Sequence, residues 1–128
     1  MSRLAEVLQH IGARPGMYFG GAPDVYSIHL VSAFITGYQH GILQHGDSLP
    51  FTHFTRWIAA RYRVNDGPNN GYYLILEHVG GDGRRAFDEF FRLLPDYVKD
   101  MNELGENGIE ARYAEVMRQI HEGGRDTF

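Results

Sequence analysis

The sequence is organised around Ile11-Gly12-Ala13-Arg14-Pro15-Gly16-Met17-Tyr18-Phe19-Gly20-Gly21, its most specific stretch. Proline fixes φ at one central position of a tight turn and glycine supplies a positive φ at the next, so Pro15-Gly16 predicts a sharp corner between two helices. We expect Met17 and Tyr18 to be mostly buried there and Gly16 to have a positive φ. The guanidinium of Arg14 is expected to cap helix-end carbonyls or to pair with a core acid.

Amphipathic helices are predicted on both sides of this corner. Before it, a helix over residues 2–10 would be capped by Ser2 and ended by Gly12. Its apolar residues recur at steps of three and four, at Leu4, Val7, Leu8 and Ile11. After the corner, a second helix would begin at Asp24 or at Ser27, since both are suitable caps. Its apolar stripe comprises Ile28, Val31, Ile35, Tyr38 and Ile42.

The second helix also carries two glycines, Gly37 and Gly41, one turn apart. Glycine costs about 1 kcal/mol in a helix interior relative to alanine, so such a pair needs a reason. We expect either a close backbone approach by another helix or a bend at this point.

A third helix is predicted from Pro50 to about Val64. Its aromatic and apolar residues follow the helical period and are expected in the core: Phe51, Phe54, Trp57, Ile58 and Tyr62. The next apolar segment, residues 72–79, fits a short strand between glycines or a helix capped by Asn70. Leucine and glutamate favour the helix, and no partner strand is visible in the sequence.

A long helix is predicted from about Arg84, with a continuous apolar stripe. The stripe comprises Phe87, Phe90, Phe91, Leu94 and Val98. Pro95 should kink or divide this helix, and a turn between Gly105 and Gly108 should precede a last helix over 109–120. The sequence therefore predicts one compact all-α domain over residues 1–128, with five to seven helices and a flexible tail over 122–128.

Composition and charge restrict the function. The chain has 128 residues and no cysteine, which excludes disulfides and thiolate catalysis. Residues 1–76 hold four acids and five bases, whereas residues 77–128 hold twelve acids and seven bases. An acidic half argues against nucleic acid and suits a partner protein with a basic surface. Because the start lacks the pattern of a signal peptide and no run could span a membrane, we expect a cytoplasmic protein.

No local pattern in the sequence predicts catalysis. The seven histidines match no metal-ligand spacing, and the usual nucleophile and phosphate-loop motifs are missing. We therefore expect no enzyme, no metal and no cofactor. The remaining enzymatic interpretation is a constellation scattered in sequence, around His29, His53 and Glu77.

The stretch from Arg14 to Gly20 resembles the Arg-Pro-Gly-Met-Tyr-Ile-Gly motif of the ATPase subunit of bacterial type II topoisomerases. In that family a helix follows with a catalytic Glu and, four residues later, a magnesium-binding Asn. Here those positions are Ala33 and Gly37. The resemblance therefore implies neither ATP hydrolysis by that mechanism nor nucleotide binding in that mode.

A second likeness covers most of the chain. The sequence is similar to small bacterial proteins that open with the same loop and continue with a helix ending in Gly-Tyr, here Gly37-Tyr38. They end with a helix whose pattern appears here as Ala86-Phe87 and Phe90-Phe91-Arg92-Leu93-Leu94. Such proteins look like immunity partners of secreted bacterial toxins. The resemblance implies a cytoplasmic protein that neutralises a cognate toxin by stoichiometric contact.

The acidic half supplies the candidate partner-binding residues, because exposed acids steer association with a basic protein. The candidates are Asp96, Asp100, Glu103, Glu106 and Glu110. Tyr72 and Tyr73 are added because tyrosine is common in interfaces. The alternative interpretation is a small-molecule or nucleotide sensor, in which Arg14 pairs with an anionic ligand and the Arg14–Gly21 loop forms a pocket wall.

Overall fold

The computed structural model describes residues 3–21, 24–42, 51–65 and 70–126, with side chains except those of 40–42 and 124–126. These ranges form six helices and no strand, so the predicted all-α fold is confirmed and segment 72–79 is helical. The helices are α1 (Arg3–Ala13), α2 (Pro15–Phe19), α3 (Ile28–Ile42), α4 (Phe54–Tyr62), α5 (Gly71–His78) and α6 (Gly83–Asp126). Within these ranges, no helix has both the length and the apolar character needed to cross a bilayer.

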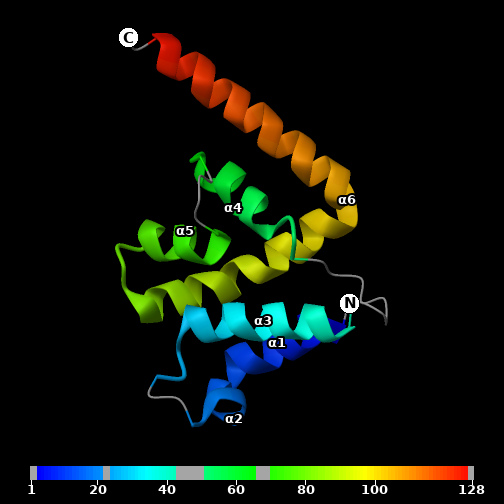
Figure 1. The fold of residues 1–128 in the computed structure, drawn as a ribbon, viewed down its shortest axis with the longest axis vertical. Helices are drawn as coiled ribbons and strands as arrows, with labels where there is room; N and C mark the ends of the chain where they lie inside the picture. Colours follow the sequence, from blue (N-terminus) through cyan, green and yellow to red (C-terminus); the bar gives the residue numbers. More distant parts are fainter. Residues whose placement is uncertain (1–2, 22–23, 43–50, 66–69, 127–128) are drawn as a thin grey trace.

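The first half of α6 is the central element of the fold. It runs between α4 and α5 on one side and α1 and α3 on the other, and packs against all four (Figure 1). Its buried side chains are Ala86, Phe87, Phe90, Leu93, Leu94 and Tyr97. The predicted stripe therefore lies in or beside the core, with Phe91 and Val98 half-buried. A helix that is apolar around so much of its circumference has to be covered from two sides.

An aromatic cluster joins α4 to α6. The ring of Phe54 lies 5.1 Å from that of Tyr97, 5.6 Å from Phe90 and 6.0 Å from Trp57. The core positions predicted for Phe54 and Trp57 are confirmed, since both are buried. Phe51 and Ile58 are buried as well, and Tyr62 is half-buried.

The helix boundaries depend on local caps. Ser27 rather than Asp24 caps α3, because its Oγ accepts a hydrogen bond from the Leu30 N–H at 3.4 Å. Asn70 caps α5 as predicted, with its Oδ1 accepting from the Tyr73 N–H at 3.0 Å. Helix α4 ends at Tyr62 because Arg63 adopts a left-handed conformation. The expectations for Ser2 and Pro50 lie outside the described residues.

The prediction that Pro95 divides the long helix is wrong. The backbone stays helical at Pro95, and the one non-helical residue within α6 is Gly105, with φ 69° and ψ 179°. Proline removes a single hydrogen bond from a stretch that is packed on two sides, whereas glycine permits a conformation closed to other residues. The chain after Gly105 is helical through Asp126, so most of the predicted tail is helix and only residues 127–128 lie outside the described part.

The predicted close approach at Gly37 is also wrong. A Cβ added at Gly37 would meet no described atom within 4 Å, and the surroundings of Gly41 lie outside the described part of the chain. The close approach occurs instead at Gly12, where a Cβ would lie 2.7 Å from the ring of Phe91. Gly12 does not end α1, which continues to Ala13. The missing side chain of Gly12 instead leaves room for the Phe91 ring of α6.

The corner after α1 differs from the predicted tight turn. Pro15 begins the short helix α2, and the positive-φ glycines of the described ranges are Gly80, Gly81 and Gly105, not Gly16. Proline suits the first position of a helix because its fixed φ is already helical. Met17 and Tyr18 are 74% and 44% exposed, so the prediction that they are buried is wrong.

Candidate functional site

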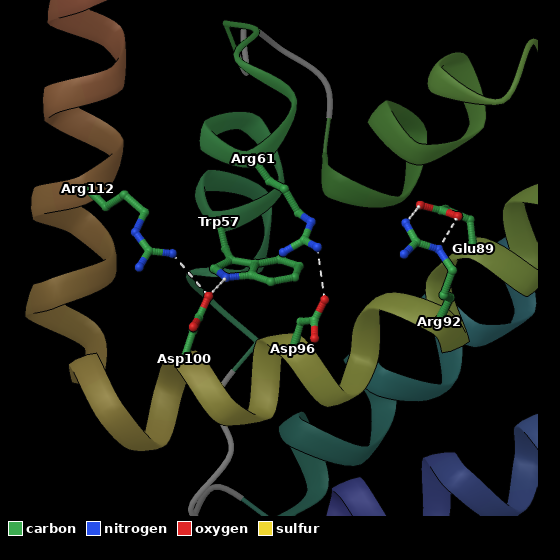
Figure 2. A network of polar contacts seen from close by, with 7 residues as sticks. All are labelled: Trp57, Arg61, Glu89, Arg92, Asp96, Asp100 and Arg112. Atoms are coloured by element: carbon green, nitrogen blue, oxygen red, sulfur yellow. Dashed lines mark hydrogen bonds and ion pairs between the residues drawn. The ribbon is translucent and has the colours of Figure 1, made fainter.

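Most of the acids predicted to meet a partner are bound by side chains of this chain. The Trp57 indole N–H donates to Asp100 at 2.8 Å, and Arg112 donates to the same carboxylate at 3.1 Å. Figure 2 shows both contacts, together with the Arg61–Asp96 ion pair at 2.9 Å. The Asp100 side chain is only 19% exposed. Asp96 and Asp100 therefore hold α4 against the first half of α6.

Glu110 binds α4 from beyond the break at Gly105. His53 Nδ1 lies 3.0 Å from its carboxylate, and Arg56 donates to both carboxylate oxygens at 3.1 and 3.2 Å. Burial alone would raise the pKa of Glu110, but the hydrogen bonds from Arg56 and His53 outweigh it and hold that pKa below its usual value. Glu106 lies 3.8 Å from His53 Nε2.

Two arginines of α4 also stack on aromatic rings. The Arg56 guanidinium lies 5.0 Å from the ring centre of Tyr113, and that of Arg61 lies 5.3 Å from the Trp57 ring.

We call the polar contacts between α4, with its flanking residues, and α6 the clasp. It comprises His53, Arg56, Trp57, Arg61 and Arg63 on one side, and Asp96, Asp100, Glu106, Glu110, Arg112, Tyr113 and Gln119 on the other.

The clasp shows that Asp96, Asp100 and Glu110 are paired within the chain, and Asp100 and Glu110 are also largely covered, whereas the side chains of Asp96 and Glu106 stay 46% and 53% exposed. Sequence patterns miss these pairs because the partners are far apart along the chain: Arg56 and Glu110 are separated by 54 residues. Among the five predicted acids, Glu103 differs, since it is exposed and has no ion pair within the described ranges. It lines a shallow groove of about 380 Å³ with Gln9, Pro95, Val98, Lys99 and Asn102.

The predicted tyrosine pair divides between core and surface. The ring of Tyr72 lies 5.3 Å from Phe54 and 5.9 Å from Phe90, and burial raises the pKa of its hydroxyl. The prediction that Tyr72 is an exposed contact residue is therefore wrong. Tyr73 points outward and is 43% exposed, so it stays a candidate. Neighbours on a helix point in directions about 100° apart, which explains the different surroundings.

The corner after α1 presents an unexpected surface. Pro15 is buried and Phe19 is half-buried, and because they are four residues apart they share the inner face of α2. Arg14, Met17 and Tyr18 are exposed. We call these three exposed side chains the α2 corner. The Pro15/Phe19 spacing was the signal in the sequence that could have predicted this orientation.

The α2 corner is attached firmly to the body of the protein. The Arg14 N–H donates to the His10 carbonyl at 2.9 Å, and the Met17 N–H donates to the Arg14 carbonyl at 3.1 Å. The Tyr18 ring meets that of Phe34 on α3 edge-on at 6.4 Å. Within the described ranges the Arg14 guanidinium has no hydrogen-bond or ion-pair partner, so the cap or core pair predicted for it is not formed with any described residue.

A further cluster lies at the C-terminal end of α4, whereas His53 lies at its N-terminal end. Tyr62 and His78 stack face to face at 3.9 Å, and Arg92 Nε donates to Glu89 at 2.9 Å (Figure 2). Burial, followed by the neighbouring Glu89 carboxylate, raises the pKa of Tyr62 to about 12. The hydrogen bond from Arg92 lowers the pKa of Glu89.

The three residues of the scattered constellation lie on different elements. His53 belongs to the clasp, whereas His29 and Glu77 are exposed on α3 and α5. Within the described ranges, no group of three histidine or acidic side chains is placed to hold a metal ion.

Comparison with known proteins finds no family model, no curated protein and no solved structure that matches this chain. Function has to be inferred from the α2 corner, the clasp and the charge of the chain.

Proposed function

We propose that this chain is an immunity-type protein that binds a bacterial toxin stoichiometrically through the α2 corner. The observation that carries the proposal is the exposure of Met17 and Tyr18, at 74% and 44%, on a helix whose other face is anchored in the body. Tyrosine, methionine and arginine are the side chains enriched in protein interfaces. The α2 corner presents one of each.

The attachment of the α2 corner favours binding. The Arg14 N–H continues the hydrogen bonding of α1 onto the start of the corner, and buried Pro15 and half-buried Phe19 hold the inner face of α2 against the body. A surface that is ordered in advance loses less conformational entropy when it binds, so more of the contact energy appears as affinity.

The charge of the chain supports a partner with a basic surface. The net charge is −4, and residues 77–128 carry the excess of acids. Asp96, Asp100 and Glu110 of the clasp are paired with arginine. Long-range steering would therefore come from the summed field and from acids such as Glu103, which has no ion pair within the described ranges.

The test is co-expression with a toxin-like protein encoded beside this gene. We expect rescue of growth and a one-to-one complex measurable by calorimetry. The double variant Met17→Ser, Tyr18→Ser should weaken binding by about 2 kcal/mol or more, which is about 30-fold in Kd. Tyr73→Ser is the comparison variant, because Tyr73 is as exposed as Tyr18 but belongs to the competing candidate surface on α5.

Two results would contradict the proposal. Absence of any complex and of rescue would exclude the immunity function. A loss of binding for Tyr73→Ser with none for the α2 corner variant would retain the function but move the contact surface to α5.

A sensor function is the second candidate, favoured by the unpaired guanidinium of Arg14 within the described ranges. Such a group can bind a phosphate or carboxylate through two parallel hydrogen bonds. A thermal-shift series with ATP, GTP and inorganic phosphate would show a rise in melting temperature that Arg14→Ala abolishes. No shift with any of these ligands would eliminate the sensor.

A further inference from the structure

We infer that residues 106–126 form an arm, hinged at Gly105 and held on α4 by the clasp, which opens and closes while the rest of the protein stays folded. The inference does not depend on the proposed function.

The hinge is set by the backbone of Gly105. Its φ of 69° and ψ of 179° belong to a region that is essentially restricted to glycine. In Figure 1 the path of α6 changes direction between its two halves, and the second half passes α4 and continues beyond it. An added Cβ at Gly105 would meet no described atom within 4 Å, so neighbouring side chains do not lock this residue in place.

Polar contacts attach the arm along much of its length. They include Glu106–His53, Glu110–His53, Glu110–Arg56, Arg112–Asp100, Tyr113–Arg56 and Gln119–Arg63. Among the arm's described side chains, Ile109 is the one that is buried, Tyr113 packs partly against the core, and Val116, Met117 and Ile120 are half-buried. The first half of α6 buries six side chains instead. Ion pairs at half-exposed sites are weak and screened by salt, so the arm should detach more readily than the core unfolds.

The arm also carries its own stabilising pairs. Arg118 bonds to Glu115 three residues earlier and to Glu122 four residues later, at 3.0 and 2.6 Å. Pairs at these spacings support an isolated helix. The arm can therefore stay helical after it leaves α4, and opening would change its position more than its secondary structure.

The test uses spin labels on two introduced cysteines, Glu77→Cys on α5 and His121→Cys on the arm, since the chain has no cysteine of its own. Both positions are exposed and lie outside the clasp. We expect one narrow distance distribution at low salt. It should broaden as salt rises to about 1 M, where the screening length falls to about 3 Å.

The double variant Arg56→Gln, Arg112→Gln should broaden the distribution at low salt. Arg85→Gln, an exposed arginine outside the clasp, should leave it unchanged. Far-UV circular dichroism reports helix content and does not depend on any single clasp residue. It should stay native while the label distance changes.

Two results would overturn the inference. In the first, the label distance stays narrow and unchanged at high salt and in the Arg56/Arg112 variant, so the arm is fixed. In the second, the distance changes only together with the loss of helix, so the arm is part of the cooperative core.

Discussion

Gly12 lies in the last turn of α1 and Gly37 in the interior of α3, and the two glycines have opposite surroundings. A methyl group at Gly12 would meet the Phe91 ring at 2.7 Å, whereas one at Gly37 would meet no described atom within 4 Å. Alanine gains helix propensity most fully at Gly37, in the helix interior. At Gly12 the contact with the Phe91 ring is expected to dominate the effect.

The same substitution should therefore have opposite effects on stability. We expect Gly37→Ala to raise the free energy of unfolding by about 0.5–1 kcal/mol. Gly12→Ala should lower it by about 1–2 kcal/mol, because the crowded Phe91 ring has to move. Urea unfolding followed by circular dichroism measures both. Equal stabilisation of the two variants would show that the Phe91 ring moves aside without lowering the free energy of unfolding.

At the scale of elements, the clasp determines how α4 meets both halves of α6. Its carboxylates form ion pairs only while they are ionised. In the folded protein the pKa of Glu110 is below its usual value. The stability that this group contributes is present above its unfolded pKa of about 4.3 and is lost as the pH falls through the lower folded value.

Glu110→Gln should remove this contribution. The variant should be less stable than the wild type at neutral pH, and the difference should shrink toward zero as the pH falls below about 4. Urea unfolding of both proteins across the acid range gives the comparison, and the other carboxylates cancel in the difference. Glu103→Gln, at an exposed acid without an ion pair in the described ranges, should show no such trend. A difference that grows on acidification would contradict the assignment.

At the scale of the whole molecule, the first half of α6 links two layers of helices into one body. Phe90 is fully buried and lies 5.6 Å from Phe54 and 5.0 Å from Phe91, so it contacts both the α4 side and its own helix neighbour. Removing it leaves a cavity in the centre of the body.

Phe90→Ala should destabilise the protein by about 3–5 kcal/mol. Because α6 contacts α1, α3, α4 and α5, the loss of the Phe90 side chain should destabilise these four helices together. The unfolding curves from Trp57 fluorescence, which reports α4, and from far-UV circular dichroism of the body should coincide. A Trp57 transition that precedes the loss of helix would contradict a single cooperative transition.

Much of the helical content was determined by the sequence alone, because its causes are local. The stripe of Phe87, Phe90 and Leu94, the cap at Asn70 and the helix over 71–78 follow from side-chain spacing and from hydrogen bonds within one turn. Such features depend on residues at most four positions apart, which the sequence displays directly.

Only the tertiary structure decided how these helices use their charged and exposed side chains. Arg56 and Glu110 meet across 54 residues, Gly12 rather than Gly37 is pressed against another helix, and Met17 and Tyr18 face solvent rather than the core. Each outcome depends on which helix lies opposite, since burial and ion pairing are set by neighbours that are distant in sequence. The stretch from Ile11 to Gly21 thus predicts a corner, while the packing of Pro15 and Phe19 decides which of its side chains face a partner.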